Sequence, residues 1–253
     1  MEKERYRRLG AHTQWAPKDA TPRLDAARLK ALQQIGGAFL WLALSVRPDI
    51  QTQVSKILSD NHRSERTWSN ILHLAGYLRK HPDRGITYYA SDMLLTAHSD
   101  ADFAAKQSRT GGYIFLGRRD ETTFINGPIQ TVSSLQSIAT ACVAEAEYIA
   151  AFTIGKYVLA IRQILHAMGY PQPTSSIFCD NLCAVGIAND DIKMKRMKYV
   201  DIKYHWLRDR VRSKDLAVLK IPGKTNVADY FTKDHPLDKH HEGMHIITTQ
   251  IRR

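Results

Sequence analysis

The stretch AEAEYIAAFTIGKYVLAIRQILHAM, residues 144–168, decides the fold because it is long, largely apolar and periodic. Its apolar residues recur in steps of three and four, which is typical of a helix that packs one face on a core. That face comprises Ala151, Ile154, Val158, Ile161, Leu165 and Met168. Glu147 lies four residues before Ala151, so we expect it to begin the packed face. Glu145 is rotated from Glu147 by about 200° and is expected to face solvent.

The segments around this helix predict strands and further helices in alternation. Extended segments rich in apolar and β-branched residues, bounded by turn residues, are predicted at 86–103, 110–116, 122–133, 176–180 and 216–221. Helices are predicted at 182–188, 200–212 and 226–233. The order of these elements is three strands, a helix, a strand, helices, a strand and a helix. This order predicts a mixed α/β fold, in which the strands form one sheet and the helices cover its faces.

The first third of the chain has a different character. Helical periodicity covers residues 25–46 and 64–80, and a further helix is expected to start near Pro48, since proline is tolerated in a first turn. We therefore expect a flexible lead-in at 1–24, an all-helical segment at 25–90, the α/β domain at 91–235 and a polar tail at 236–253.

Composition restricts the classes of protein. Apolar residues make up 43% of the chain and charged residues 24%, which is ordinary for a globular protein. The longest apolar run has 12 residues, at 35–46, whereas a membrane span needs roughly 20, so we expect no membrane partner. Three cysteines and no secretory signal favour a reducing compartment, cytoplasmic or nuclear. The net charge of +11 favours nucleic acid as a partner.

Four acidic residues stand where predicted strands end or helices begin. Asp100 and Asp180 close strands, while Glu147 and Asp229 lie in the first turns of helices. Ligand sites of α/β sheets gather at strand ends, and carboxylates brought together repel unless a hard cation neutralises them. The four acids therefore form a candidate site for two Mg²⁺ ions. For Glu147 alone, an acid that merely complements the helix dipole is an equally good reading.

The motifs around these acids carry a family resemblance. They are SDADF at 99–103, SRTGGY at 108–113, GPI at 127–129, AEAEY at 144–148, CDN at 179–181, DIKYH at 201–205 and NVADYFTK at 226–233. Together, in this order and spacing, they resemble the ribonuclease H domain of a copia-type retrotransposon polyprotein. GAFLWL at 37–42 and RPDI at 47–50 resemble the helical region that follows the polymerase palm in the same polyproteins.

The resemblance implies a ribonuclease H-like five-stranded mixed sheet flanked by helices, preceded by a thumb-like or connection-like helical segment. It implies that Asp100, Glu147, Asp180 and Asp229 are catalytic and hold two Mg²⁺ ions, with Mn²⁺ able to substitute. The substrate would be the RNA strand of an RNA·DNA hybrid, cleaved by in-line attack of water. Other parts of a reverse transcriptase or a larger nucleoprotein assembly would be further partners.

A polymerase activity is not expected. A polymerase needs paired aspartates on a hairpin between apolar strands, and Asp190-Asp191 is flanked by polar residues. The absence of palm and fingers motivates an alternative, a non-catalytic nucleic-acid-binding or scaffold protein recruited from a retroelement. The intact set of four acids favours the nuclease.

Two further patterns allow a functional and a structural interpretation. Lys193, Lys195, Arg196 and Lys198 fall within six residues and are expected to contact phosphates, although a solvated face is the alternative. Lys224 precedes the segment with Asp229 and is a weaker candidate of the same kind. His241 and His245 match a zinc-protease spacing, but Gly243 weakens the helix this needs, so a polar tail is favoured.

Overall fold

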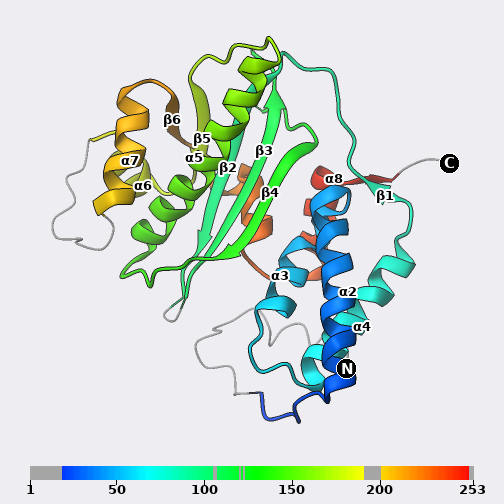
Figure 1. Cartoon of the computed structure of the whole chain (residues 1–253). Coiled ribbons are helices and arrows are strands. Elements are labelled where there is room, and N and C mark those ends of the chain that lie inside the picture. Colours follow the sequence, from blue (N-terminus) through cyan, green and yellow to red (C-terminus); the bar gives the residue numbers. More distant parts are fainter. Residues whose placement is uncertain (1–18, 105–106, 120, 122, 191–200, 251–253) are drawn as a thin grey trace. The chain divides into compact units, whose positions relative to one another are not determined.

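The chain forms two units, shown in Figure 1. The computed structural model describes residues 19–104, 107–119, 121, 123–190 and 201–250, without the side chains of 201–204 and Leu237. One unit comprises residues 88–233 and contains the sheet. The other combines residues up to Thr87 with those from Asp234 onward. The unit with the sheet carries all four acids of the candidate site.

The sheet has five strands in the order β4-β3-β2-β5-β6. They are β2 (Leu94–Asp102), β3 (Arg109–Gly117), β4 (Pro128–Leu135), β5 (Ser175–Cys179) and β6 (Leu216–Lys220). Strand β3 is antiparallel to both β2 and β4, whereas β5 is parallel to both β2 and β6. The predicted five-stranded mixed sheet with flanking helices is confirmed.

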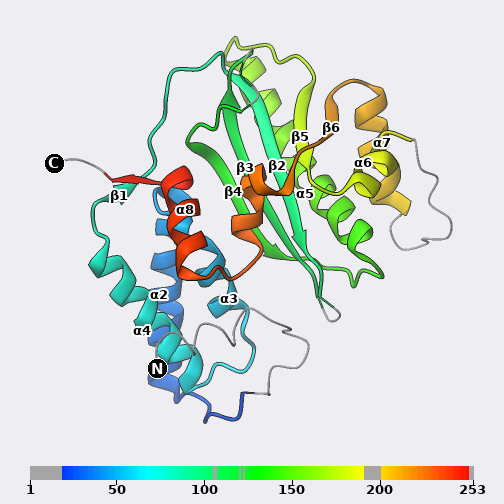
Figure 2. The ribbon, with the colours of Figure 1, turned by 180° about the vertical axis from the view of Figure 1, so that it is seen from behind.

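The sheet is covered differently on its two faces. Helix α5 (Val143–Ala167) packs on one face, beside α6 (Leu182–Ala188) and α7 (Asp201–Arg212). The 3₁₀ turn η4 (Val227–Phe231) lies on the other face, in front of the sheet in Figure 2. Neighbouring glycines of β3 show this directly. A Cβ on Gly112 would meet Ile154 of α5, whereas one on Gly111 would meet the backbone oxygen of Ala228 in η4.

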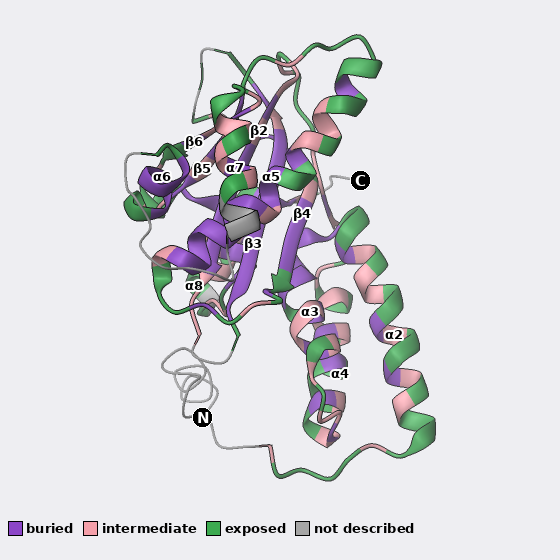
Figure 3. Cartoon of the chain, turned by 60° about the vertical axis from the view of Figure 1, so that its left-hand side comes forward, coloured by how far each residue is buried: buried purple, intermediate pink, exposed green. Residues whose placement is uncertain are grey.

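Helix α5 supplies much of the core. Ile154 and Val158 are fully buried, and Figure 3 shows the sheet-facing side of the helix and strand β3 as buried. The helix is long and apolar enough to cross a membrane by length and composition, but half of its most apolar window is buried inside the unit. It therefore serves as the core helix of this fold.

The prediction for Glu145 was wrong. Its side chain is buried, with 6% of the residue exposed, and Oε2 accepts a hydrogen bond of 2.6 Å from the backbone N–H of Ala141. The segment that leads into α5 folds over the first turn and satisfies this carboxylate. Helical periodicity predicts only which side of a helix faces the sheet. It contains no information about a preceding loop that covers the other side, as the loop at Ala141 does here.

Two predicted elements are shorter or tighter than expected. The extended segment predicted at 86–103 forms strand β2 only from Leu94 onward. Before Leu94, the backbone N–H and C=O of Tyr89 form hydrogen bonds with the Asn126 side chain, so they are not available for pairing with a neighbouring strand. The helix expected at 226–233 is the 3₁₀ turn η4, preceded by the short 3₁₀ turn η3 (Gly223–Thr225).

The other unit is built on three α-helices and a 3₁₀ turn. They are α2 (Ala26–Ser45), η2 (Pro48–Ile50), α3 (Gln51–Ser59) and α4 (Glu65–Lys80). Asp25 caps α2, and Ser64 forms a capping box with Thr67 at the start of α4. Leu32, Val54 and Ile71 lie in the shared apolar core. The helical character expected for this part of the chain is present.

The expected polar tail is part of this unit instead. Helix α8 (Leu237–Ile247) buries Met244 and Ile247, and β7 (Thr249–Gln250) pairs antiparallel with β1 (Arg84–Gly85). Met244 also accepts a hydrogen bond from the Tyr77 hydroxyl at its sulfur. The polar residues of the segment occupy one side of an amphipathic helix, so the few apolar ones were sufficient to anchor it.

Candidate active site

Asp100 lies near the end of β2 and is almost fully buried, with 1% exposed. Its Oδ2 accepts a hydrogen bond of 2.5 Å from the hydroxyl of Thr232. Burial raises the pKa of Asp100 to about 6, and the charges of Asp229 and Asp180 contribute, against the lowering effects of Lys233 and Thr232. Above this pKa the carboxylate is ionised in a site that disfavours its charge, which is a suitable state for binding a cation.

Glu147 projects from α5 and is 4% exposed. The Cys179 thiol lies 3.8 Å from its Oε2, in hydrogen-bond contact. Burial raises the pKa of Glu147 to about 9, and the charges of Asp100 and Asp180 raise it further. The side chain therefore points into the acidic cluster, as the helical periodicity predicted, and is protonated at neutral pH when no cation is bound.

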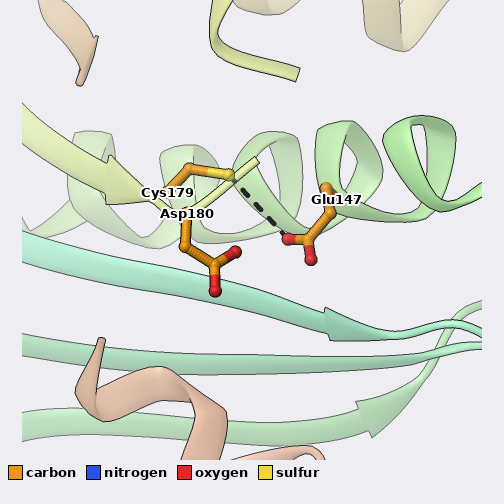
Figure 4. Close-up of side chains that lie close together, drawn as sticks. All are labelled: Glu147, Cys179 and Asp180. Atoms are coloured by element: carbon orange, nitrogen blue, oxygen red, sulfur yellow. Dashed lines mark hydrogen bonds between the residues drawn. The ribbon is translucent and has the colours of Figure 1, made fainter. Parts of the chain in front are cut away.

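Asp180 follows β5 directly and is partly exposed. Figure 4 shows Glu147, Cys179 and Asp180 pointing toward one another, and one ligand atom from each lies within 4.8 Å of the others. Gly223 passes close to Asp180: a Cβ at this glycine would lie 3.0 Å from Oδ2. A larger residue at this position would therefore require the Asp180 carboxylate to shift by a few tenths of an ångström.

Asp229 is held by the attachment of η4 to the end of β2. The Asn226 side chain caps η4 by accepting from the backbone N–H of Ala228 at 3.2 Å, and donates to the carbonyl of Ser99 at 3.0 Å. Nδ1 of His98 accepts from the backbone N–H of Val227 at 3.2 Å. These bonds join η4 to the two residues that precede Asp100, so they fix Asp229 beside that strand end.

Lys233 bridges Asp100 and Asp229. Its ammonium forms an ion pair with Oδ1 of Asp229 and lies 4.0 Å from Oδ2 of Asp100. The carboxylates of Asp100 and Asp229 raise the pKa of Lys233 despite its partial burial. The lysine is therefore charged and partly neutralises the cluster.

The structure brings the four predicted acids to one end of the sheet. Lys233 joins Asp100 and Asp229, ligand atoms of Glu147 and Asp180 lie within 4.8 Å of each other, and the charges of Asp100 and Asp180 raise the pKa of Glu147. Oxygen ligands held together against their mutual repulsion fit a divalent cation. Which of these residues takes part in catalysis remains a prediction.

The predicted phosphate contacts fall in two places. Lys193, Lys195, Arg196 and Lys198 lie outside the described residues. Lys224 is exposed on η3, next to Gly223, and hence at the border of the acidic cluster.

Sequence reasoning missed Lys233, Thr232 and the contact of Cys179 with Glu147. Lys233 lies four residues after Asp229, and this acid-to-base spacing is a recognisable ion-pair pattern. Cys179 immediately precedes Asp180 in the sequence. It is fully buried, but only the tertiary structure places its sulfur against a carboxylate.

Curated proteins similar to the chain are Pol polyproteins of plant transposons. The Pol polyprotein from transposon TNT 1-94 of Nicotiana tabacum is 31% identical over 208 residues, which cover 80% of this chain and 15% of the polyprotein. That from transposon RE1 of Arabidopsis thaliana is 30% identical over 79% of this chain and 13% of its own length. The chain thus spans about one seventh of these relatives.

Solved structures similar to the chain have low sequence identity to it. LC11-RNase H1, isolated from compost, has 16% identity and a TM-score of 0.42, with 55% of this chain and 93% of that one covered. A foamy viral protease-reverse transcriptase has 12% identity and a TM-score of 0.45, with 81% and 33% covered. No family model matches the chain. The homologues of this chain are therefore Pol polyproteins of plant copia-type transposons, as the motifs around the four acids indicated.

Proposed function

We propose that the unit with the sheet is a metal-dependent endonuclease that hydrolyses the RNA strand of RNA·DNA hybrids. The observation that carries the proposal is the convergence of Asp100, Glu147, Asp180 and Asp229 at one end of the sheet, with the pKa values of Asp100 and Glu147 raised. Acids with a purely structural role are expected to be paired with basic side chains or hydrogen-bond donors that lower their pKa values. In a cation site, the carboxylates keep raised pKa values until a bound cation neutralises their charges.

The residues present fit a pair of divalent cations, Mg²⁺ or Mn²⁺. Asp100, Glu147, Asp180 and Asp229 would hold them through carboxylate oxygens. When bound, such ions lower the pKa of water and stabilise the charge that develops on a scissile phosphate.

The chain itself orients the carboxylates. Thr232 fixes one oxygen of Asp100 by its hydrogen bond, and Asn226 and His98 hold η4 so that Asp229 faces β2. Glu147 lies on the rigid first part of α5, with the Cys179 thiol against one oxygen. Fixed side chains of this kind reduce the reorganisation that binding a cation and a phosphate requires.

Lys224 and the cluster at 193–198 would bind the nucleic-acid backbone. Their contacts would add affinity and salt dependence without sequence preference. Discrimination of RNA from DNA would depend on the 2′-hydroxyls and on the shape of the hybrid.

The test is cleavage of an end-labelled RNA·DNA hybrid, with single-stranded RNA and duplex DNA of the same sequence alongside. We expect the parent chain to cut only the RNA of the hybrid, to need Mg²⁺ or Mn²⁺, and to leave 5′-phosphate ends. The Asp180→Asn variant should lose cleavage and keep hybrid binding, because it removes one charge from the cation site and none from the basic surface.

Asp215→Asn is a matched control, because this aspartate pairs with Arg210 beyond the end of α7 and belongs to no part of the acidic cluster. It should cleave as the parent does. Salt-sensitive hybrid binding by the parent without cleavage in either metal would contradict the nuclease and favour a nucleic-acid-binding scaffold.

A further inference from the structure

The acidic cluster is divided into two halves that differ in charge compensation. Asp100 and Asp229 share the Lys233 ammonium, which pairs with Asp229 and lies 4.0 Å from Oδ2 of Asp100. Among the ion pairs of the described residues, none includes the carboxylate of Glu147 or Asp180. The nearby Lys220 ammonium bonds the main-chain oxygens of Asp180 and Ile221.

Lys233 is placed so that it can both occupy and leave its half of the cluster. It lies two residues after the end of η4 and four residues after Asp229, and its side chain is 45% exposed. Its four-carbon stem gives the ammonium several rotamers that reach water. The pair of Lys233 and Asp229 has side chains that are 45% and 31% exposed, and such a pair is worth about 1 kcal/mol or less, so a divalent cation can displace it.

We propose that Lys233 is an internal cation that fills the Asp100–Asp229 half of the site in the metal-free protein and sets the order in which divalent ions enter. This inference rests on the proposed function, because it concerns the same cation site. The first ion enters the Glu147–Asp180 half, where it displaces the proton of Glu147 and no tethered ammonium has to leave. The second ion binds only as Lys233 withdraws from Asp100 and Asp229.

The proposal predicts two unequal affinities for ions in the absence of nucleic acid. The second ion must replace an existing ion pair and approach a positive charge that stays tethered nearby. An ion pair of about 1 kcal/mol corresponds to roughly a fivefold loss of affinity. Replacing Lys233 by a neutral residue should therefore strengthen the second binding event and leave the first nearly unchanged.

The experiment is a titration of the full chain with Mn²⁺, followed by the electron paramagnetic resonance signal of free Mn²⁺. The variants are Lys233→Met, which keeps the apolar stem without the charge, and Lys233→Arg, which keeps the charge. Lys156→Met is the control for net charge. Lys156 is exposed on α5, nine residues beyond Glu147, which is about 13 Å along a helix and outside the Debye length at physiological salt.

We expect the parent, Lys233→Arg and Lys156→Met to bind one ion tightly and a second weakly. Lys233→Met should bind the second ion about fivefold more tightly. The thermal unfolding of each protein checks that it is folded, and Lys233→Gln is a second neutral variant if Lys233→Met does not fold.

Two results would overturn the inference. Equal second-ion affinities in the parent and both neutral Lys233 variants would show that the ammonium does not compete. An equal gain in Lys156→Met would show a general effect of charge. In both cases a parent that binds Mn²⁺ and cleaves the hybrid leaves the proposed function intact. A parent that binds no ion at all would overturn the proposed function as well.

Discussion

The Cys179 thiol sulfur lies 3.8 Å from Oε2 of Glu147, and a carboxylate oxygen of Asp180 lies within 4.8 Å of both ligand atoms (Figure 4). Oxygen-only sites favour Mg²⁺, whereas a sulfur ligand favours softer ions such as Cd²⁺ and Zn²⁺. Burial raises the pKa of this thiol to about 12, so it is protonated until a metal ion replaces the proton. The cluster therefore contains one donor that Mg²⁺ does not use.

We predict that Cd²⁺ binds to the cluster through Cys179. Titration of the parent with Cd²⁺ should produce the ultraviolet absorption of a sulfur-to-cadmium bond, with release of a proton. Cys179→Ser should lose this absorption, while Cys183→Ser, at an exposed neighbouring thiol, should keep it. Absorption that persists in Cys179→Ser and disappears in Cys183→Ser would place the ion outside the cluster.

The raised pKa of Glu147 predicts how stability depends on pH without metal. The folded-state pKa of about 9 exceeds the ordinary value of 4.5, so the stabilising effect of the proton is complete below pH 4.5 and is lost as pH rises toward 9. Asp100, with a pKa of about 6, adds the same trend at lower pH. Each pKa unit corresponds to about 1.4 kcal/mol. The ionisation of Glu147 should therefore lower the free energy of unfolding by more than about 2 kcal/mol between pH 6 and pH 8.5.

Urea unfolding in a chelator at these two pH values measures the effect. Glu147→Gln should be more stable than the parent at pH 8.5 and should lose most of the decline, because the amide carries no charge. A parent whose free energy of unfolding is the same at both pH values would mean that Glu147 is ionised and compensated in the folded protein.

Gly111 allows η4 to lie directly on the sheet. A Cβ at this position would be 2.5 Å from the backbone oxygen of Ala228 and from Cγ2 of Thr232. We predict that Gly111→Ala moves η4, lowers the free energy of unfolding by about 1–3 kcal/mol and weakens Mn²⁺ binding through Asp229.

Gly117→Ala, in the same strand, is the control. Its Cβ would meet the Thr96 hydroxyl at 3.1 Å, which a side-chain rotation can relieve. Urea unfolding and Mn²⁺ titration of both variants should separate the two positions. Equal, small effects would mean that η4 does not need the close approach.

Arg47 and Asp49 form a buried ion pair in the helical unit. Two hydrogen bonds of 2.9 and 2.8 Å join them, the Tyr77 hydroxyl donates to Asp49, and Arg47 donates to the carbonyl of His81. The side chains are 4% and 0% exposed. Removing one partner of such a pair leaves a buried charge, so Asp49→Asn should cost about 3–5 kcal/mol in urea unfolding.

The exposed pair of Arg28 and Glu65 is the matched comparison, with side chains 48% and 42% exposed. Glu65→Gln should change the free energy of unfolding by less than about 1 kcal/mol. A cost for Asp49→Asn as small as that for Glu65→Gln would show that water reaches the Arg47 guanidinium in the variant.

Some features of the site followed from local sequence alone. The periodicity of α5 placed Glu147 on the buried face, because side chains separated by three or four residues share one side of any helix. Asp100 and Asp180 were identified as strand-end residues, because the apolar runs before them end there. Each inference used only neighbours along the chain.

Other features depended on segments far apart in the sequence. Met244 is buried because α8 returns to the N-terminal helices. The position of Lys233 between Asp100 and Asp229 required η4 to be held at the end of β2, where Asn226 bonds Ser99, 127 residues away in sequence. Glu145 is buried through a contact that is close in sequence but not helical, because the backbone N–H of Ala141 in the loop before α5 donates to its carboxylate. Local periodicity cannot encode such contacts.

By itself, therefore, the sequence determined most elements of the mixed sheet and the identity of four candidate acids, because propensity and periodicity act over a few residues. Only the tertiary structure decided the raised pKa values of Asp100 and Glu147 and the cation that compensates Asp100 and Asp229, because burial and Coulomb interactions depend on distances in space.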